Sequence, residues 1–473
     1  MATSKTTLLI PVESQARELD PKLLLACVAA RRGFASIIGP RREMHFHIPS
    51  FPRSIYLSKS TTKGSRGVFR TLRRLGHQIV AWDEEALVHL PPETYYRHRL
   101  SPISLGYVSH LLAWGEDNAE LWRQYPEFPS ERPLKITITG NPRGDLLRPE
   151  IRVYYDSERK KICERYGDFI LINTNFGLVN AFHADMNLIP PAPPDDSAGG
   201  LGRKVISLGL NRESAEELHN HKYAIFEDFQ QLIPELEKAF PGYNIIVRPH
   251  PSENPQIYHN IAAKCKRVEV TNEGNVVPWL LAAKALIHNG CTTGVEAFAV
   301  DTPAISYRAT VNERFDEAFH HLANQLSHQC FEFAALRKTL SNILSNNIDT
   351  AHVDQRKTLI NRYLAAQDGP LACERMVDIF EEMTQNSFDS SMPGIKHRLQ
   401  SWYWATRRRF KKRIRGYRAN LSHNRPDYLR HRYPEISLQE VYSRLNHFQL
   451  VLGDHTELKV EKIFNQFYRI SAG

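Results

Sequence analysis

The first 140 residues alternate between short apolar runs and longer segments in which apolar residues recur every three or four positions. The short runs predict buried strands, and the longer segments predict amphipathic helices. The expected strands are 7–13, 35–39, 54–59, 78–83, 110–115 and 135–140, and the expected helices are 20–33, 66–76 and 117–126. In helix 20–33, Asp20 is the expected N-cap, Pro21 lies in the first turn and Gly33 marks the end. This alternation predicts a parallel sheet with helices on both faces.

The same pattern begins again at residue 168. The second set of expected strands is 168–176, 243–249, 267–271, 285–290 and 303–308, with helices 214–240, 276–285 and 293–300 between them. Residues 186–203 are rich in Pro, Gly and Asp and predict a loop. The fold class is therefore α/β, with two doubly wound, Rossmann-like domains that face each other across a cleft, and a C-terminal appendage. We place the domains at 1–150 and 151–385 and the appendage at 386–473. Ligands of such sheets bind outside the carboxyl ends of the strands.

The net charge of +9 comes from one segment, residues 396–418. It holds ten basic residues and no acid, and the 51 basic and 52 acidic residues elsewhere nearly cancel. These residues are Lys396, Arg398, Arg407, Arg408, Arg409, Lys411, Lys412, Arg413, Arg415 and Arg418. The apolar residues between them are Ile395, Leu399, Trp402, Tyr403, Trp404, Phe410, Ile414 and Tyr417. Most of them recur at helical spacing, which is typical of an amphipathic helix that lies on an anionic membrane surface. A helix packed on the body of the protein and a nucleic-acid site are the alternatives.

Apolar stretches and cysteines in the sequence indicate where in the cell the protein is located. The longest apolar stretch, 276–287, is too short to span a bilayer, and the acidic Glu13 follows the first apolar run, which excludes a signal peptide. The six cysteines are scattered without a CxxC pair, so neither a disulfide framework nor a zinc site is expected. We therefore expect a cytoplasmic protein that is soluble or peripheral at the inner face of the cytoplasmic membrane.

Two strand ends of the second domain carry residues suited to binding phosphate. One is "RPHP", 248–251, and the other is "HNGCTTGVEA", 288–297. Small residues and a helix start near a strand end offer backbone N–H groups to a phosphate, and a histidine fixed between two prolines can donate to it. The candidate residues are Arg248, His250, Pro251, Asn289, Gly290, Thr292, Thr293 and Glu296. A capping box between Thr293 and Glu296, and a histidine that only holds its loop, are the structural alternatives.

These motifs resemble those of a known family. "RPHP", "HNGCTTGVEA", "TGNPRGDLLRPE" (139–150) and "ILINTNFG" (170–177) are similar to the GT-B glycosyltransferases of bacterial surface polysaccharide biosynthesis, in particular Kdo-transferases and bacterial sialyltransferases. The resemblance implies that His250 and Pro251 contact the nucleotide phosphate or ribose. It also implies that Thr292 and Thr293 hold the phosphate and that Glu296 lies near the ribose. Because no DxD triplet occurs and fixed donors can stabilise the phosphate charge, no metal ion and no cofactor are expected.

The first domain is expected to supply the sugar and acceptor side of the cleft. Asp83, Glu84 and Glu85 follow a strand, and closely spaced carboxylates can raise one another's pKa, so that one acts as a general base. Related sialyltransferases carry an acidic pair followed by glycine here, whereas this chain has Ala86 in place of the glycine. A helix N-terminus enriched in acids is the alternative.

Three further segments contribute candidates for sugar or acceptor binding. Arg17 and Glu18 follow the first strand, where Arg17 is placed to bind an anionic sugar, or alternatively to pair with a neighbouring glutamate. Asn173 and Asn175 end the first strand of the second domain and can bind sugar hydroxyls. Segment 139–150 follows the last strand of the first domain, and we expect it to be the crossover between the domains.

The sequence thus predicts an enzyme, a metal-independent glycosyltransferase. The expected donor is a CMP-linked acidic sugar such as Kdo, and the expected acceptor is a surface glycan or a lipid-linked glycan. An anionic membrane surface, contacted through 395–420, is the expected partner, and nucleic acid is not. A nucleotide-sugar 2-epimerase or a polyglycerol-phosphate transferase of the same fold is the alternative. A non-catalytic nucleic-acid-binding or scaffold protein is the alternative from another class.

Overall fold

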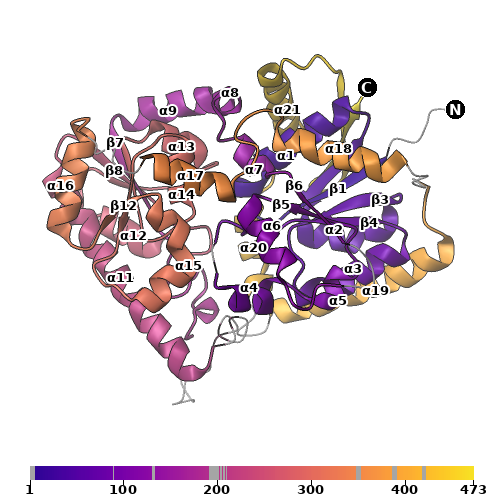
Figure 1. Ribbon diagram of the computed structural model, residues 1–473, viewed down its shortest axis with the longest axis horizontal. Coiled ribbons are helices and arrows are strands. Elements are labelled where there is room, and N and C mark those ends of the chain that lie inside the picture. Colours follow the sequence, from indigo (N-terminus) through magenta and orange to yellow (C-terminus); the bar gives the residue numbers. More distant parts are fainter. Residues whose placement is uncertain are drawn as a thin grey trace.

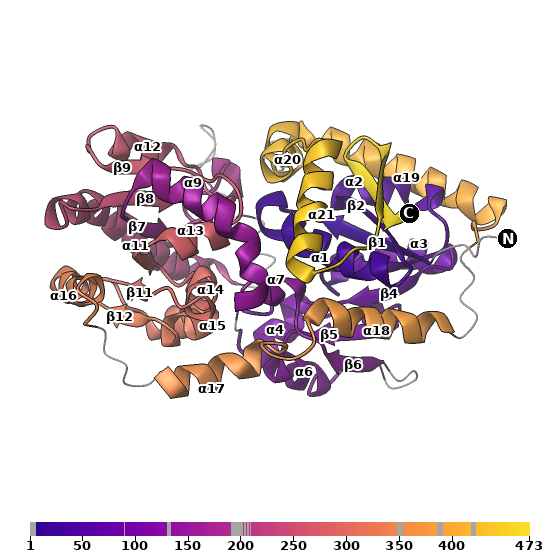
Figure 2. The same ribbon diagram turned by 90° about the horizontal axis from the view of Figure 1, so that it is seen from above.

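The computed structural model describes residues 6–88, 90–129, 134–190, 202, 205, 208, 210–347, 353–385, 391–417 and 422–473. Two sheets lie side by side, each with helices against its faces (Figures 1 and 2). Most of the predicted loop 186–203, the start of the predicted linker at 386–390, and Arg418 with the rest of 418–420 lie outside the described residues.

The first sheet contains six parallel strands from the N-terminal part of the chain, in the order β2-β1-β3-β4-β5-β6. They are β1 (Thr7–Val12), β2 (Ala35–Pro40), β3 (Ser54–Ser58), β4 (Gln78–Ala81), β5 (His110–Ala113) and β6 (Lys135–Ile138). Every residue of β1 is buried, as the unbroken apolar run predicts for a strand covered on both faces. All six strands coincide with predicted ones, apart from a residue or two at their ends.

The second sheet is parallel throughout, in the order β12-β11-β10-β7-β8-β9. Its strands are β7 (Phe169–Asn173), β8 (Asn244–Arg248), β9 (Val268–Val270), β10 (Ala285–His288), β11 (Ala304–Tyr307) and β12 (His328–Cys330). Only β12 has no counterpart among the predicted strands, because its sequence, "HQC", is short and polar. The predicted architecture of two parallel, Rossmann-like sheets is confirmed.

Helices connect the strands in both domains. Those of the first domain and the crossover are α1 (Gln15–Arg31), α2 (Arg41–His47), α3 (Arg66–Arg74), α4 (Pro92–Arg99), α5 (Pro102–Leu105), α6 (Glu116–Arg123), α7 (Pro142–Asp145) and α8 (Pro149–Arg152). Those of the second domain are α9 (Asp156–Tyr166), α11 (Arg212–Ala239), α12 (Gln256–Ala262), α13 (Val277–Ala282), α14 (Thr293–Ala299), α15 (Glu313–Gln325) and α16 (Phe333–Leu344).

Helix α1 begins five residues earlier than predicted, which corrects the role given to Asp20. The helix starts at Gln15 and ends before Gly33, whose φ of +84° is the left-handed conformation that glycine adopts readily. Asp20 is not an N-cap. It accepts hydrogen bonds from Tyr155 and Asn275 and pairs with Arg444 at 2.6 Å. This carboxylate therefore joins the first domain, the crossover, the second domain and the C-terminal part of the chain.

The C-terminal part of the chain returns to the first domain. Its helices are α17 (Val353–Tyr363), α18 (Ala372–Gln385), α19 (Ile395–Gly416), α20 (Pro426–Arg432) and α21 (Leu438–Leu452). An antiparallel hairpin, β13 (Leu458–Phe464) and β14 (Phe467–Ala472), then joins the edge of the first sheet, where β14 pairs with β2. Helix α18, which the sequence assigned to the second domain, packs on α1 in the first (Figure 2).

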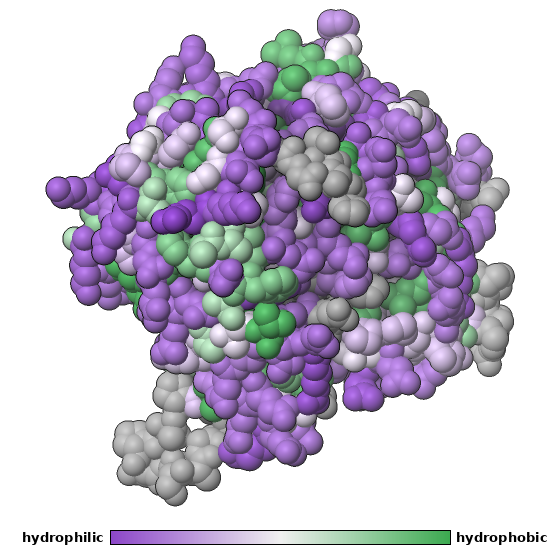
Figure 3. All heavy atoms as spheres, turned by 60° about the vertical axis from the view of Figure 1, so that its left-hand side comes forward, coloured by the Kyte–Doolittle hydropathy of each residue, from purple (hydrophilic) through white to green (hydrophobic). Residues whose placement is uncertain are grey.

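The surface of the second domain is mostly polar. Figure 3, which brings the left-hand side of Figure 1 forward, shows hydrophilic side chains over most of that face, with apolar ones in separate groups. Among the described residues, none of the helices combines the length and the apolar character needed to cross a membrane.

Candidate functional site

A cavity of about 450 Å³ opens between the two domains and is lined from both. Most of the predicted site residues line it: Arg17, Glu85, Asn173, Asn175, Arg248, His250, Pro251, Gly290, Thr292, Thr293 and Glu296. Asp83, Glu84, Glu18 and Asn289 do not line it. The carboxyl ends of β7, β8 and β10 all meet at this cavity, because parallel neighbouring strands end at the same edge of a sheet.

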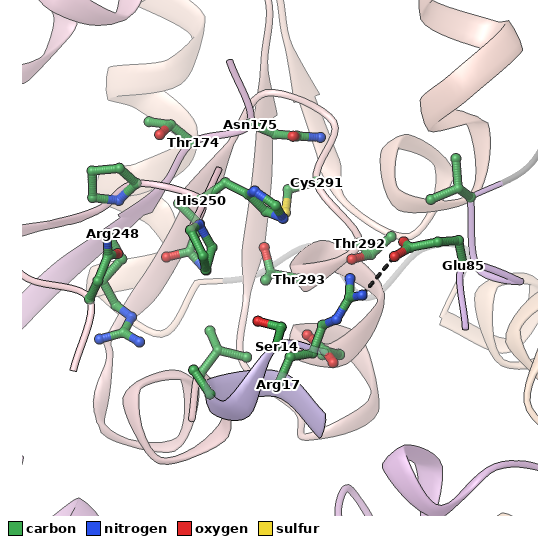
Figure 4. A pocket seen from close by; sticks show the side chains of 18 of the residues that line it. Ser14, Arg17, Glu85, Thr174, Asn175, Arg248, His250, Cys291, Thr292 and Thr293 are labelled. Carbon is green, nitrogen blue, oxygen red and sulfur yellow. Dashed lines mark hydrogen bonds and ion pairs between the residues drawn. The ribbon is translucent and has the colours of Figure 1, made fainter. Parts of the chain in front are cut away.

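His250 lies at the centre of the cavity, beside Cys291 and above Thr293 (Figure 4). Its Nδ1 atom accepts a hydrogen bond from the backbone N–H of Ser252 at 3.1 Å and lies 2.7 Å from the Ser252 hydroxyl. An imidazole nitrogen that accepts a backbone N–H carries no proton, so in the neutral ring the proton resides on Nε2. His250 is therefore prepared to act as a hydrogen-bond donor through Nε2.

Glu253, which the sequence analysis missed, fixes the loop that carries His250. Its buried carboxylate accepts hydrogen bonds from the His250 backbone N–H at 3.0 Å, from Thr174 at 2.9 Å and from Tyr258 at 2.7 Å. Burial raises the pKa of Glu253, although these hydrogen bonds oppose the effect. The loop after β7 also approaches closely, since a Cβ atom on Gly177 would collide with the Ser252 hydroxyl. An acid three residues beyond the histidine was the signal available in the sequence.

Helix α14 begins at Thr293, where the sequence places it, but the predicted capping box does not form. Thr292 occupies the N-cap position without a side-chain capping bond. Glu296 instead accepts a hydrogen bond from Arg143 at 2.7 Å, and both side chains are buried. Arg143 belongs to the crossover between the domains, so this ion pair connects α7 to α14 across the cavity wall.

Arg248 lines the cavity, but its guanidinium group holds a neighbouring loop. It donates to the backbone oxygens of Glu273 at 2.8 Å and Gly274 at 3.3 Å, and it lies 4.6 Å from the centre of the Trp279 ring. In Figure 4 the group points away from Thr293. Burial lowers the pKa of Arg248 to about 10, although Glu158 and Glu273 oppose the effect. The arginine thus positions the cavity wall.

Three buried polar atoms at these strand ends have no hydrogen-bond partner among the described residues. They are Oδ1 of Asn173, Oδ1 of Asn289 and the hydroxyl of Thr293. Asn173 and Thr293 line the cavity. Buried polar atoms in folded proteins nearly always have partners, so atoms left without one in a concave site indicate a place for a ligand or for water.

On the first-domain side, Arg17 and Glu85 form an ion pair of 2.7 Å at the cavity surface (Figure 4). Arg17 also lies 3.8 Å from Glu18, so the alternative of pairing with a neighbouring glutamate holds in part. Burial acts to raise the pKa of Glu85, but the charge of Arg17 and its hydrogen bond outweigh burial and lower the pKa to about 2. The expected increase through mutual repulsion of carboxylates therefore does not occur at Glu85.

The other predicted acids lie beneath the cavity. Glu18 accepts hydrogen bonds from the backbone of Glu13 and from Lys22 and Lys59, and it is fully buried. Burial would raise its pKa, but Lys22, Lys59 and Arg17 hold it well below its usual range.

Asp83 and Glu84 stabilise the turn after β4 through hydrogen bonds. Glu84 accepts a hydrogen bond from the indole of Trp82 at 2.9 Å, and Asp83 accepts one from the backbone of Glu85 at 3.0 Å. Both are buried away from the cavity lining, and their contacts are those of residues that position a turn.

Several cations that the sequence analysis did not assign to the site, Arg99, Arg143, Lys222 and Arg432, also line the cavity. Among the described residues, six cationic and two acidic side chains line the cavity: Arg17, Arg99, Arg143, Lys222, Arg248 and Arg432 against Glu85 and Glu296. Lys222 is buried on α11, and burial lowers its pKa to about 8, although Asp316 opposes the effect. Its place on the apolar stripe of α11, between Leu218 and Ile225, was a signal in the sequence. Arg432 comes from α20, about 180 residues beyond His250, and no local pattern indicates it.

Helix α20 contacts the histidine loop directly. The Nε2–H of His431 donates a hydrogen bond to the Pro251 carbonyl oxygen at 2.8 Å. The His431 ring also stacks on Phe182, with 4.5 Å between the ring centroids. The C-terminal part of the chain therefore completes the cavity. Among the described residues, no group of three or more His, Cys, Asp or Glu side chains is placed to hold a metal ion.

No protein-family model and no curated protein sequence matches this chain. Among similar solved structures is the wall teichoic acid polymerase TagF, soaked with CDPG, at 11% identity, covering 80% of this chain and 88% of that chain, with a TM-score of 0.48. The UDP-GlcNAc 2-epimerase of Methanocaldococcus jannaschii, in complex with UDP-GlcNAc and UDP, has 12% identity, 80% and 100% coverage and a TM-score of 0.43. The same enzyme from Rickettsia bellii has 12% identity, 81% and 98% coverage and a TM-score of 0.45. These are distant likenesses, and neither a family nor a residue role is carried from those proteins to this chain.

Proposed function

We propose that this protein transfers a group from a nucleotide-linked donor to an acceptor in the cleft between its two domains, without a metal ion. The observation that supports this most strongly is the charge of the cavity. Arg17 and Arg143 are paired with the two acids of the lining, and Arg99 lies 3.9 Å from Asp83. Among the described residues, the other three cations, Lys222, Arg248 and Arg432, have no carboxylate within ion-pair distance. Such a cavity favours an anionic ligand, and its volume lies in the range of small-molecule sites.

In the proposed reaction, residues of the second domain bind the departing phosphate. Breaking a bond to a nucleotide phosphate leaves negative charge on the phosphate oxygens, and donors fixed beforehand stabilise that charge. His250 would donate from Nε2, Lys222 would supply a buried positive charge, and the Thr293 hydroxyl would gain the partner that it lacks. In a water-poor cleft these interactions are stronger than in bulk water.

For the donor and acceptor we propose a CMP-linked acidic sugar, such as Kdo, and a surface glycan or lipid-linked glycan. The carboxylate of such a sugar would meet Arg99 and Arg432, which line the cavity from α4 and α20. Asn173 and Asn175 would bind sugar hydroxyls. Glu85 is the carboxylate on the acceptor side, and to act as a base it would have to exchange Arg17 for the acceptor, because a pKa of about 2 makes a weak base.

A second candidate is a nucleoside diphosphate donor, used in polyol-phosphate transfer or 2-epimerisation. The net positive charge of the cavity favours it, because a diphosphate carries more negative charge than the single phosphate of a CMP-linked sugar. The two candidates share the site and differ in the donor.

A donor screen tests the proposal. Thermal unfolding would be measured with CMP, CDP, UDP and GDP compounds, followed by product analysis for each compound that stabilises the protein. A ligand at a hundred times its Kd stabilises the fold by about 2.7 kcal/mol. Lys222→Gln should remove the stabilisation, while Lys238→Gln, an exposed lysine of the same helix, should leave it unchanged. Steep, salt-dependent binding of nucleic acid without any donor turnover would instead favour the non-catalytic alternative.

We further propose that α19 attaches the protein to the inner face of the cytoplasmic membrane. One face of the helix packs on the protein, and the opposite face is exposed. Ser401 and Ala405 are buried against the body, whereas Leu399, Tyr403 and Phe410 are 65%, 70% and 65% exposed. Trp404 packs on the first-domain core and Trp402 faces outward. Exposed apolar residues flanked by basic ones on a single helix face suit an anionic bilayer surface.

Flotation with anionic vesicles tests this attachment without unfolding the helix. Replacing Leu399, Tyr403 and Phe410 by serine should release the protein from vesicles at low salt, because apolar burial is lost. Leu450→Ser, a 79% exposed apolar residue on α21, is the matched control and should leave flotation unchanged. Flotation of the wild type should also weaken as salt rises, since the charge attraction is screened over ~10 Å at 0.1 M. A triple variant that floats like the wild type would exclude this surface.

A further inference from the structure

A second cavity lies beneath the inner face of α19, separate from the cleft. It has a volume of about 190 Å³ and is bounded by α2, the loop after β3 and α19, whose neighbouring positions are seen in Figures 1 and 2. Four cations line it: Arg41 and Arg42 from the start of α2, and Arg408 and Lys412 from α19. The described residues of its lining include no carboxylate, and none of them lines the cleft.

The positive charge of this cavity is largely uncompensated. The Nε atoms of Arg42 and Arg408 are buried without a hydrogen-bond partner among the described residues. Of the two nearest acids, Glu13 lies 3.2 Å from Arg41 but is shared with Lys59 at 2.7 Å, and Glu43 lies 3.6 Å from the neighbouring Arg409. Glu13 thus pairs with one of the four cations, Arg41, whereas Arg42, Arg408 and Lys412 have no ion pair among the described residues.

The cations repel one another in a partly desolvated space. Burial, together with Arg408, Arg42 and Arg41, lowers the pKa of Lys412 to about 8. Burial and the same cationic neighbourhood hold the pKa of His45 well below its usual range, so the ring stays neutral and contacts the Tyr56 hydroxyl at 2.8 Å. Crowding like charges destabilises the unliganded protein, and such arrangements occur typically where a ligand of opposite charge binds.

We propose that this cavity binds a phosphate group, a phosphomonoester or a diphosphate, beneath α19. A phosphate carries about −1.5 to −2 charges at pH 7 and three acceptor oxygens, which matches several guanidinium groups better than a carboxylate does. The cavity is smaller than the usual range for drug-sized ligands, so it suits one charged group and excludes a nucleoside. The hydroxyls of Thr62 and Ser65 at the wall add donors.

The phosphate can reach this cavity from two sources. A lipid headgroup would be presented by the membrane on which the exposed face of α19 is proposed to lie, and a soluble phosphate compound would enter from water. The site is independent of the group-transfer reaction proposed for the cleft, because it shares no lining residue with the cleft.

Two double variants on the same helix provide the test. Arg408→Gln with Lys412→Gln removes two charges from the cavity. Arg407→Gln with Lys411→Gln removes two charges from exposed neighbouring positions, so the net charge of the two proteins is equal. Calorimetric titration with inorganic phosphate and pyrophosphate forms the soluble arm. The membrane arm is flotation with vesicles that contain phosphatidic acid, compared with phosphatidylglycerol vesicles of matched surface charge.

The cavity pair should bind the phosphate probe at least about tenfold more weakly than the wild type, as expected for the loss of charge-assisted hydrogen bonds. The exposed pair should bind within about twofold of the wild type, since solvent screens exposed charges. If the cavity pair loses affinity for inorganic phosphate or pyrophosphate, the ligand is a soluble phosphate compound. If it loses the preference for phosphatidic acid vesicles over phosphatidylglycerol vesicles, the ligand is a lipid headgroup. Equal loss in both pairs would show diffuse attraction and overturn the proposal, as would a wild type that binds in neither arm.

Unfolding of the unliganded variants separates binding from structure. The cavity pair should melt at or above the temperature of the wild type, because repulsion inside the cavity is relieved. If the double variant does not fold, Arg408→Gln alone, whose Nε has no partner among the described residues, carries the same binding test. A lower melting temperature in both cavity variants would mean that the cations hold α19 in place, which contradicts a ligand site.

Discussion

The carboxyl ends of the two sheets face the same cleft but are built differently. At the first sheet, charged side chains are paired within the protein: Glu18 with Lys22 and Lys59, and Arg17 with Glu85. At the second sheet, Asn173 and Thr293 have buried polar atoms without partners among the described residues. The charged groups of the first edge thus form ion pairs, although Nε of Arg17 and Oδ2 of Asp83 also lack a hydrogen-bond partner among the described residues. The atoms without a partner at the second edge belong to uncharged side chains, which leaves a donor and an acceptor for a ligand.

This difference distinguishes buried polar and charged residues that hold the structure together from those that are available to bind a ligand. Buried charges are tolerated when they are paired and hydrogen-bonded, and a residue in such a network positions the backbone. Buried polar atoms without a partner are costly unless a ligand or water completes them. Of the polar residues at the two edges, Asn173 and Thr293 are therefore the better candidates for contact with the donor, although Arg17 and Glu85 reach the same cavity.

The largest expected effect is on stability, from Glu18 at the first edge. Glu18→Ala leaves Lys22 and Lys59 buried without their shared partner, which should lower the free energy of unfolding by about 3–5 kcal/mol. Glu164→Ala, which breaks an exposed pair with Lys160, should cost about 1 kcal/mol or less. Urea unfolding of both variants measures the difference. Similar values for the two would show that the first edge does not depend on this network.

The dependence of stability on pH should show the contribution of the ion pairs around Glu18. Because the pKa of Glu18 in the folded protein lies well below its unfolded value, the unfolded state binds more protons as the pH falls. The stabilisation is therefore present above the unfolded pKa of about 4.5 and is lost as the pH decreases below it. The wild type should lose this stability in acid, and Glu18→Ala should show a flatter dependence.

The next effect is on turnover, from His250 at the second edge. His250→Ala removes the Nε2 donor and should lower kcat by about 10²-fold or more with the fold intact. His259→Ala, an exposed histidine on α12, is the control and should keep wild-type turnover. Steady-state kinetics with the donor found in the screen, together with circular dichroism, measure both. Wild-type activity in a folded His250→Ala protein would make this histidine a purely structural residue.

A smaller effect concerns the pH dependence of donor binding through Lys222. If the ammonium group holds a donor phosphate, affinity should fall by up to about tenfold per pH unit above pH 8, where Lys222 loses its proton. The stability of the free protein should change in the opposite direction. Between about pH 8 and 10.5 the unfolded chain keeps a proton that the folded chain has lost, so stability rises with pH. Titration of the wild type and Lys222→Gln across this range measures both, and equal slopes would remove Lys222 from the site.

The smallest expected effect is that of metal removal. Because cations and fixed donors surround the proposed phosphate position, chelation by EDTA should leave turnover within about twofold of the untreated enzyme. Assays of EDTA-treated protein with and without added Mg²⁺ or Mn²⁺ check this. Activity that depends strictly on either ion would contradict the metal-independent site proposed for the second edge.

Local pattern predicted the candidate site best where one strand end supplies several residues. His250, Thr292 and Thr293 are close in sequence to the strands that position them, so spacing alone placed them in one cavity. The same reasoning misjudged Glu84 and Glu18, since a strand-end acid can point into the cavity or beneath it. For Glu84, the nearby cations Lys22 and Arg143 come from other elements. For Glu18, Lys22 lies one turn further along the same helix, but Lys59 comes from another element.

The sequence by itself determined the parallel strands of the two sheets, except β12, and the basic amphipathic helix, because each depends on periodicity within a short window. Tertiary structure decided which charges are paired and which remain available, because a carboxylate and its partner cation are often far apart in the chain. It also returned the C-terminal part to the first domain, where β14 extends the sheet beside β2 and Arg432 reaches the cavity. The hairpin gains its stability from backbone hydrogen bonds to a strand more than 400 residues earlier, and no local pattern encodes that partner.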